Sequence, residues 1–338
     1  MAVERKKVEF LYFTQDEVEK NLPSQKEIIK IMEDVFIAHA QGNAILPPKF
    51  PLDLEHKYGG HLNIMPGYLG DIDIAGIKLI TAYLDNLEKG LPSAMAMINL
   101  YKSTTGEPLA IMEGGLITLL RTGAVSVVAA KYLAPENAKV LGIIGGGAVA
   151  PYHIYSVAEV IDLDEVRVVD INKERANKVA ERVSKELGIK VVAKDTCQEV
   201  SEGADIIITS TRMEKPKPLV KNEWVKDGAL VMGTGQAFEL DYEIPCRADK
   251  IIVDNLGQCK KIPMGWGFSV LFRDKVIDWP DIYAELGEVI LDKNKRRKNN
   301  EEVIVLWPRG MGTEDVATAY YVYKNALEKK LGTTLSLF

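Results

Sequence analysis

Apolar residues in the second half of the chain gather in short runs that alternate with helix-like segments. Each run is about as long as a buried strand, and Val and Ile are frequent in most of them. An amphipathic helix is predicted over 173–187, and a helical segment over 281–291. Alternating strands and helices predict an α/β fold with a doubly wound parallel sheet. The predicted strands are 140–144, 166–169, 190–193, 205–211, 229–232, 250–254 and 303–306.

The first half of the chain is patterned differently, because its strands follow one another with few helices between them. Helix-start signals at Thr14 and Ser24 predict two helices, the second running to about Ala40. A long helix rich in small residues is predicted over 115–132, and a last helix over 314–330. Strands are predicted at 8–13, 74–83, 95–101 and 109–112, with irregular strands over 49–69.

The predicted strand 140–144 ends in a glycine-rich turn of the form G-x-G-x-x-A. Gly145 allows the tight turn, Gly147 lets the backbone approach a pyrophosphate, and Ala150 keeps helix and strand close. Asp170 ends the next strand about 20 residues later, where a carboxylate binds ribose hydroxyls and repels a 2′-phosphate. We therefore predict NAD, rather than NADP, as the cofactor. The alternative is a glycine turn in an ordinary βαβ unit.

Two other predicted strand ends suit the path of a cofactor. Ligands of open α/β sheets bind outside the carboxyl ends of the strands. Thr209, Ser210 and Thr211 end one strand, and Gly233 follows the next. The alternative for the three hydroxyl residues is local capping of the strand end.

Two basic residues outside this domain are candidates for the chemistry. Lys78 stands in an otherwise apolar strand, where an ammonium group is costly to bury without a partner, and where it would polarise a carbonyl or imine or donate a proton. Arg121 stands among apolar and small residues, and its planar guanidinium suits a carboxylate. The alternatives are an edge strand with Lys78 facing water, and a structural ion pair for Arg121.

Composition narrows the classes of protein. A length of 338 residues favours about two domains, and 47% apolar with 27% charged residues is typical of a globular protein. The net charge of −6 argues against a nucleic-acid partner. No apolar run reaches 18 residues and the first residues have no apolar core, so we expect no membrane-spanning helix and no signal segment. The three cysteines are scattered, which favours a reducing, cytoplasmic compartment, and neither they nor the four histidines show ligand spacing, so we expect no metal site.

Several short motifs, in order along nearly the whole chain, resemble those of the ornithine cyclodeaminase/mu-crystallin family, which includes archaeal-type alanine dehydrogenase and ketimine reductases. Their number and order make the resemblance specific. The motifs are Met65-Pro66-Gly67-Tyr68, Gly76-Ile77-Lys78, Gly90-Leu91-Pro92, Thr105-Gly106-Glu107-Pro108-Leu109-Ala110, Arg121-Thr122-Gly123-Ala124 and Gly310-Met311-Gly312-Thr313-Glu314-Asp315-Val316-Ala317.

The resemblance implies a Rossmann domain over 135–314 and a substrate and dimerisation domain, of α+β type, formed by 1–134 with 315–338. It also implies a homodimer. It places Lys78 and Arg121 at the substrate as catalytic residues, and adds Lys49, His61 and Met65 as substrate-binding residues. The cofactor-binding residues expected on this basis are Thr122, Gly145, Gly147, Ala148, Val149, Asp170, Ile171, Asn172, Thr209, Ser210, Thr211 and Gly233.

The chain also departs from the family's pattern. Asn63 stands where ornithine cyclodeaminase has an acid, and no acid follows the predicted strand 229–232 before Glu239. Lys49 replaces an arginine, which removes bidentate geometry. We therefore expect an NAD-dependent oxidoreductase acting on the CH–N bond of an amino acid or cyclic imino acid, with His61 as a candidate proton relay or an ordinary surface or core histidine.

Two other functions stay open. One is a cyclodeaminase, an ammonia-lyase that uses bound NAD catalytically. The other is a nucleotide-binding protein with little turnover. The aromatic residues Trp266, Phe268, Phe272 and Trp279 either line a pocket for a bulky substrate or pack a core or a dimer contact.

Overall fold

The computed structural model describes residues 7–213, 217–235, 238–261 and 267–338. The chain forms two compact units, which we describe separately. Unit 1 comprises Met1–Arg121 with Met311–Phe338, and unit 2 comprises Thr122–Gly310. The first boundary lies inside a continuous helix, rather than at 134/135 as expected from the resemblance. The part of this helix that belongs to unit 2 packs closely there, since a Cβ on Gly123 would lie 2.5 Å from the backbone of Tyr152.

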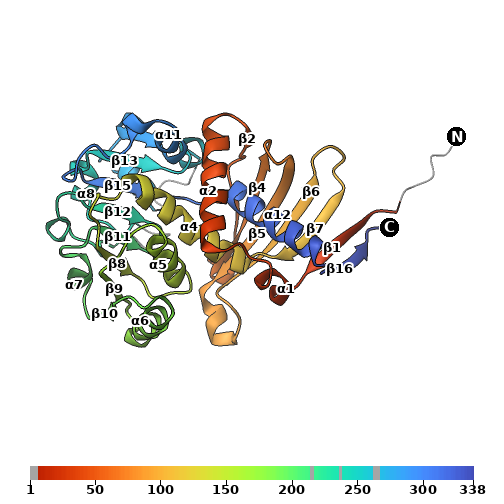
Figure 1. Ribbon diagram of the computed structural model, residues 1–338, viewed down its shortest axis with the longest axis horizontal. Coiled ribbons are helices and arrows are strands. Elements are labelled where there is room, and N and C mark those ends of the chain that lie inside the picture. Colours follow the sequence, from red (N-terminus) through yellow and green to blue (C-terminus); the bar gives the residue numbers. More distant parts are fainter. Residues whose placement is uncertain (1–6, 214–216, 236–237, 262–266) are drawn as a thin grey trace. The chain divides into compact units, whose positions relative to one another are not determined.

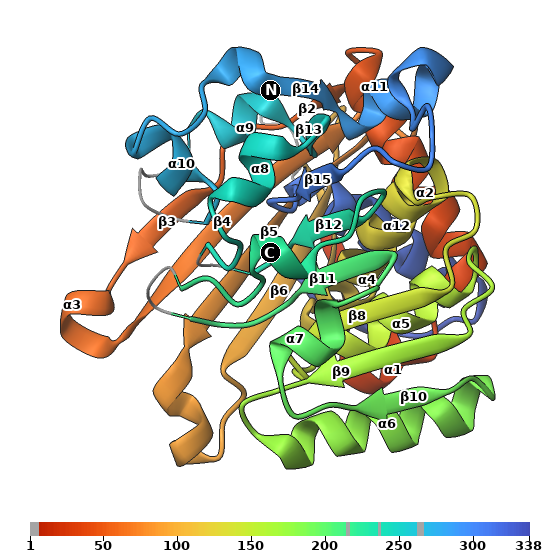
Figure 2. The same cartoon turned by 90° about the vertical axis from the view of Figure 1, so that its left-hand side faces the viewer.

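The described part of unit 2 is built on an eight-stranded sheet in which every pair is parallel (Figure 1 and Figure 2). The strand order is β10-β9-β8-β11-β12-β15-β13-β14, so the chain reverses direction across the sheet between β8 and β11. The predicted α/β fold with a doubly wound parallel sheet is thereby confirmed. The strands are β8 (Val140–Ile144), β9 (Glu165–Val169), β10 (Val191–Ala193), β11 (Ile206–Thr209), β12 (Leu230–Gly233), β13 (Lys250–Val253), β14 (Ile282–Glu285) and β15 (Ile304–Trp307).

Short helices connect and cover these strands. The Asn172 side chain caps α6 by accepting from the backbone N–H groups of Glu174 and Arg175. The segment 281–291 is not wholly helical as expected, because its first part is strand β14 and only the rest is helix. The helices of unit 2 are α5 (Ala150–Ala158), α6 (Lys173–Leu187), α7 (Cys197–Ser201), α8 (Glu243–Arg247), α9 (Leu256–Cys259), α10 (Ser269–Arg273) and α11 (Leu286–Leu291).

Unit 1 contains a mixed eight-stranded sheet, of order β16-β1-β7-β6-β5-β4-β2 with β3 paired to β4. The segment 49–69, expected to be irregular, holds the regular ten-residue strand β4. Strand β16 at the chain's end had no counterpart in the sequence analysis. The strands are β1 (Glu9–Phe13), β2 (Ala44–Ile45), β3 (Phe50–Asp53), β4 (Gly60–Leu69), β5 (Ile74–Tyr83), β6 (Ala94–Lys102), β7 (Pro108–Glu113) and β16 (Thr333–Ser336).

Helix α12 (Gly312–Glu328) covers one face of this sheet over β4, β5 and β6, and α2 (Gln25–Ala40) packs on α12 (Figure 1). Three glycines allow this close approach. A Cβ on Gly67 would lie 2.9 Å from the backbone nitrogen of Thr313, one on Gly76 would lie 2.8 Å from Val316, and one on Gly312 would lie 2.7 Å from the Met65 carbonyl oxygen. The start of α12 is therefore fixed directly over β4 and β5. The remaining helices of this region are α1 (Gln15–Glu19), α3 (Glu55–Tyr58) and α4 (Gly115–Leu133).

Helix starts follow the sequence signals closely. Thr14 and Ser24 each form a capping box, with Glu17 and Glu27 respectively. Helix α4 is long and apolar enough to cross a membrane by length and composition, but 67% of its most apolar window is buried inside the protein, as in a core helix.

Candidate active site

Unit 1 brings four charged side chains together beneath the start of α12. Lys78 lies in the middle of β5 and is fully buried, and its Nζ is 2.7 Å from Asp315 Oδ2. Arg121 donates from Nε to Asp315 Oδ1 at 3.0 Å, and from Nη1 to Glu314 Oε2 at 2.7 Å. Both acids lie in the first turn of α12 and are fully buried. The helix dipole stabilises negative charge at that position.

The pKa values of the two cations move in opposite directions. Burial and the neighbouring Arg121 lower the pKa of Lys78 to about 8, against the opposing effect of Asp315 and Glu314. Burial also lowers the pKa of Arg121, but Asp315 and Glu314 outweigh it, so the pKa of Arg121 is raised above its ordinary value. Of the two cations, Lys78 is therefore the one whose charge can change at mildly alkaline pH, while Arg121 keeps a permanent charge.

The alternative that placed Lys78 on an edge strand facing water is wrong, because β5 lies between β4 and β6. Arg121 does form an ion pair with buried acids, as its alternative held. Its side chain nevertheless keeps 8% of its surface exposed, whereas the Lys78 side chain keeps 1%. Arg121 therefore reaches further toward solvent than Lys78 does.

The other predicted substrate residues follow the strand register. Met65 pairs directly with Lys78 across β4 and β5. Lys49 is half-buried and immediately precedes β3. Since Phe50 of β3 pairs with Ile64, Lys49 comes opposite the next residue of β4, Met65, and so lies in the same row as Met65 and Lys78.

His61 lies on the same face of β4, but four residues from Met65, which is about 13 Å along a strand. It contacts Glu55 at 3.3 Å. This position is distant from Lys78, so the register does not favour His61 as a proton relay.

In unit 2, the glycine-rich turn fits a dinucleotide. Gly145 adopts a φ of 110°, and a Cβ there would lie 2.6 Å from the Ser210 carbonyl oxygen, so only glycine suits this position. A Cβ on Gly147 would meet nothing within 4 Å, which leaves open space beside the turn. Ala148 is exposed, and Val149 precedes the first residue of α5. The backbone N–H groups at a helix start of this kind favour a diphosphate.

The predicted ribose carboxylate is held in place by backbone groups. Asp170 Oδ2 accepts from the N–H of Gly146 at 2.8 Å, and Oδ1 accepts from the N–H of Asn172 at 2.8 Å. Each oxygen has a second lone pair that remains for a ribose hydroxyl. The Ile171 side chain beside it is fully exposed at 105%, which leaves an apolar surface for a flat ring. These residues fit an NAD molecule.

The hydroxyl residues after β11 are less available than expected. Thr209 is fully buried, and its Oγ1 donates to the Met232 carbonyl oxygen at 3.5 Å. The Thr211 hydroxyl donates to Glu239 Oε1. These contacts favour the strand-end alternative for these two side chains. Ser210 and Gly233 stay partly exposed at the carboxyl edge of the sheet, and Thr122, on α4, is also partly exposed.

Sequence reasoning did not select three acids that the structure brings to these clusters. Glu314 and Asp315 belong to the closing motif, and two acids in the first turn of a helix were the signal that could have found them. Glu239 is buried and accepts hydrogen bonds from the N–H and the hydroxyl of Thr211. Burial raises the pKa of Glu239, although bonds from Thr209, Thr211 and Gly235 act against this shift.

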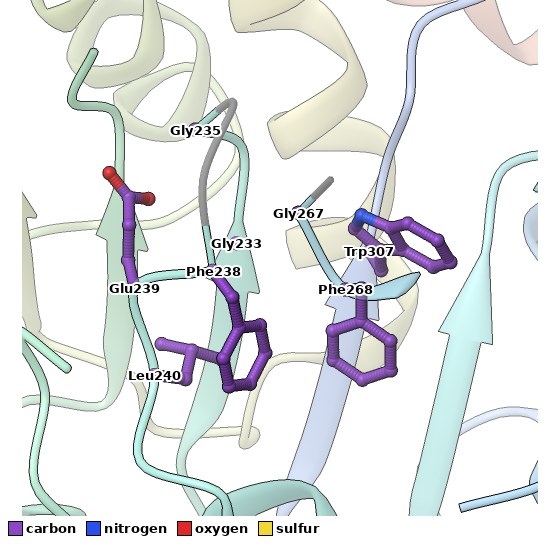
Figure 3. A pocket seen from close by; sticks show the side chains of 8 residues that line it. All are labelled: Gly233, Gly235, Phe238, Glu239, Leu240, Gly267, Phe268 and Trp307. Atoms are coloured by element: carbon purple, nitrogen blue, oxygen red, sulfur yellow. The ribbon is translucent and has the colours of Figure 1, made fainter. Parts of the chain in front are cut away.

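The predicted aromatic cluster packs in the core of unit 2. Phe268 stacks on Trp307 at 4.9 Å, and Phe272 stacks on Trp279 at 3.9 Å. Trp266 lies outside the described residues. Figure 3 shows a hollow beside this cluster, with room for little more than a water molecule. Among the described residues, the stacking and burial of these rings favour core packing over a pocket for a bulky substrate. The lining residues are Gly233, Gly235, Phe238, Glu239, Leu240, Gly267, Phe268 and Trp307.

Comparison with known proteins supplies close relatives over the whole length. Alanine dehydrogenase of Archaeoglobus fulgidus is 36% identical over 335 residues, which cover 98% of this chain and 99% of that protein. The structure of Thermococcus litoralis Δ1-pyrroline-2-carboxylate reductase with NADH and L-proline is 36% identical, with a TM-score of 0.89 over 96% of this chain and 99% of that one. An archaeal alanine dehydrogenase dimer with bound NAD is also 36% identical, with a TM-score of 0.89 over 98% and 100%.

The fold, the glycine-rich turn with Asp170 and these relatives define an NAD-dependent oxidoreductase. A sequence profile of the ornithine cyclodeaminase/mu-crystallin family matches residues 9–330. The chain belongs to this family, so the predicted resemblance and the predicted cofactor are both confirmed.

Proposed function

We propose that this protein interconverts a small α-amino acid and its imino acid, with Lys78 and Arg121 of unit 1 as the residues that act on the substrate. The class of reaction, oxidation or reduction at the C–N bond of an amino or imino acid with NAD, is that of the relatives. The observation that carries the residue assignment is the buried cluster in which Lys78 and Arg121 share Asp315.

The substrate class is proposed from size and charge. Relatives of equal similarity act on alanine and on Δ1-pyrroline-2-carboxylate, which share a carboxylate beside a C–N bond and a small aliphatic remainder. The Arg121 guanidinium, on α4, suits that carboxylate, and Lys49 adds a positive charge in the sheet row of Met65 and Lys78.

Lys78 supplies the proton chemistry in this proposal. With its pKa near 8, Lys78 holds a proton on Nζ in part of the molecules at neutral to mildly alkaline pH, and it gives or takes that proton as the substrate nitrogen changes charge. Bound NAD supplies a hydride acceptor or donor, held by the glycine-rich turn and Asp170. Arg121 keeps the carboxylate in place throughout.

Cyclodeamination is disfavoured because this chain lacks a free carboxylate at the two positions where ornithine cyclodeaminase is expected to have one. Asn63 occupies the position of one acid expected for an ω-amino group, and it is uncharged. Glu239 is the first acid after β12, but it is buried and bonded to Thr211. Neither side chain offers a free carboxylate to a second amino group.

A homodimer is proposed from the face of the unit 1 sheet opposite α12. Phe50, Ile64, Leu79 and Met97 form one row across four strands, and Phe50 and Met97 are 64% and 50% exposed. An apolar face of this kind is typical of an interface. The archaeal alanine dehydrogenase neighbour is a dimer. Light scattering should give a molecular mass twice that of the chain, and the mass of a Met97→Glu variant should shift toward that of the monomer.

We infer a cytoplasmic location. The three cysteines, all among the described residues, are free thiols, which fits a reducing compartment. The relatives are metabolic enzymes. Fractionation of the native cells, followed by activity measurement, tests this inference.

The function is tested by incubating the purified protein with NAD and a panel of amino acids, N-methyl amino acids and cyclic imino acids. Absorbance at 340 nm and ammonia are followed in parallel. NADH with equal ammonia supports an amino-acid dehydrogenase, and NADH without ammonia supports oxidation of a cyclic or secondary amine. Ammonia without NADH would mean cyclodeamination and would overturn the proposal. Tight NAD binding with no product in either channel would favour a nucleotide-binding role instead.

A further inference from the structure

Asp315 contacts both cations of the unit 1 cluster, and no other carboxylate among the described residues does so. One of its oxygens lies 2.7 Å from Lys78 Nζ, and the other accepts from Arg121 Nε at 3.0 Å. Glu314 hydrogen-bonds Arg121 but reaches Lys78 only through longer-range attraction. The two neighbouring acids therefore share Arg121, and only Asp315 also contacts Lys78.

The position of Asp315 is fixed by the backbone around it. It lies in the first turn of α12, and the close contacts of Gly312 with β4 and of Gly76 with Val316 leave that turn little room to move. A hydrogen bond of 2.8 Å also joins the Thr313 hydroxyl to His39 Nε2. A carboxylate held this firmly keeps Lys78 and Arg121 at a constant separation.

The charges of this cluster balance only when Lys78 is protonated. Lys78 and Arg121 then carry two positive charges against the two negative charges of Glu314 and Asp315. A substrate carboxylate adds one more negative charge at a buried site, where such a charge is costly without compensation. A neutral Lys78 would leave the occupied cluster with two uncompensated negative charges.

We propose that Asp315 is a positioning residue that couples binding of the substrate carboxylate to a proton on Lys78. The carboxylate binds tightly to the form of the protein in which Nζ carries its proton, and the neutral form takes up one proton from water as it binds. This proposal rests on the proposed function, since it takes the unit 1 cluster as the site for the carboxylate.

The groups that face Lys78 support this coupling. Arg121 and Thr118 face it from α4, and Asp315 and Glu314 face it from α12. Its partners in the neighbouring strands are the uncharged Met65 and Ile98. Burial and Arg121 lower the pKa of Lys78 while Asp315 and Glu314 raise it, so loss of the Asp315 charge lowers that pKa further.

The test measures binding of propionate to the NAD-loaded protein between pH 6.5 and 9.5. Propionate carries a carboxylate but no amino group, so its own charge is constant over this range. In the unmodified protein, the dissociation constant should be level below pH 8 and rise about tenfold per pH unit above it. In Asp315→Asn, the pH at which this rise begins should fall.

Glu314→Gln is the matched control, because Glu314 adjoins Asp315 but lies further from Lys78. The rise in its dissociation constant should begin at a pH closer to that of the unmodified protein. An Asp315→Asn protein whose curve rises at the same pH as the unmodified protein would overturn the proposal. A dissociation constant that does not change with pH, or no propionate binding at all, would also overturn it.

Calorimetry keeps the test independent of how well the variant folds. Titration of the unmodified protein with propionate at pH 8.5, in two buffers of different ionisation enthalpy, should show uptake of roughly 0.8 proton per site, since Lys78 is mostly neutral there. Binding without proton uptake would contradict the coupling. These measurements need no turnover, so they fail separately from the proposed function, which fails when no amino or imino acid is converted.

Discussion

The candidate sites of unit 1 and unit 2 are built in opposite ways. In unit 2, the nucleotide site consists mainly of backbone: a glycine turn, the N–H groups at a helix start, and one carboxylate, Asp170, held by the N–H groups of Gly146 and Asn172. In unit 1, the site consists of charged side chains from three distant segments, held by one another in a buried cluster. Changes in unit 2 should therefore alter cofactor binding, whereas changes in unit 1 should alter chemistry and carboxylate binding.

The largest expected effect is that of Lys78→Ala. Removal of the proton-exchanging group should lower kcat/KM by about 10²–10⁴-fold, the usual contribution of a positioned acid or base. The affinity for NAD should not change, because the nucleotide residues lie in unit 2. Steady-state kinetics and NADH fluorescence titration on the same preparation measure both. If kcat/KM and the affinity for NAD fell by the same factor, the proposed division of roles between unit 1 and unit 2 would be wrong.

Acid should destabilise unit 2 through His153, which is fully buried against Ser126 at 2.7 Å. Burial lowers the pKa of His153 to about 4, below the value of about 6.5 in an unfolded chain. The unfolded state then binds more protons, so stability is lost as the pH falls from about 6.5 to 4, by up to about 3 kcal/mol.

The check is urea unfolding of the His153→Gln variant across that pH range. The variant should lose less stability than the unmodified protein. His39 in unit 1, whose pKa burial also lowers to about 4, is the comparison site, and His39→Gln should behave in the same way. Identical acid sensitivity in all three proteins would contradict this account of the histidines.

Gly145→Ala should weaken NAD binding and the fold together. The φ of 110° and the 2.6 Å approach to the Ser210 carbonyl oxygen leave no room for a side chain, so a cost of about 1–3 kcal/mol is expected. Gly147→Ala is the matched control, since its Cβ meets nothing within 4 Å. It should keep the melting temperature and still bind NAD more weakly. A loss of stability in both variants would argue against open space at Gly147.

The smallest effect concerns cofactor choice. Asp170→Ser removes the charge that repels a 2′-phosphate, and the ratio of NAD to NADP affinity should fall about tenfold, or ~1.4 kcal/mol. Taking the ratio cancels any loss from the hydrogen bonds of Asp170 to Gly146 and Asn172. An unchanged ratio would mean that Asp170 does not select the cofactor.

The difference between a site built of backbone and a site built of distant side chains explains which features could be predicted from the sequence. The strands of unit 2 are continuous apolar runs, and the glycine turn with Asp170 is a local signal, so both could be predicted along the chain. Lys78 and Arg121 were also visible, because a charge in an apolar segment is unusual. Their joint contact with Asp315 depends on the packing of α12 over β5, which local patterns do not specify. Arg121 and Asp315, for example, are 194 positions apart in the chain.

Two elements show why the remainder was harder to predict. Strand β14 was expected to be helical, because a short apolar run of this kind fits either structure and its pairing with β13 is a tertiary contact. Thr211 was expected to contact the cofactor, but its hydroxyl donates to Glu239, a residue 28 positions away. Both outcomes depended on partners that the local pattern does not specify.

Transfer of deuterium from the α-carbon tests the central claim most directly. The best amino acid from the substrate panel, labelled with deuterium at that carbon, is incubated with NAD, and both products are examined by mass spectrometry. The account predicts deuterium on the reduced nicotinamide, and transfer at least about 100-fold slower in the Lys78→Ala protein at unchanged NAD affinity. Deuterium retained in the organic product, without net NADH, would contradict the account and indicate a cyclodeaminase.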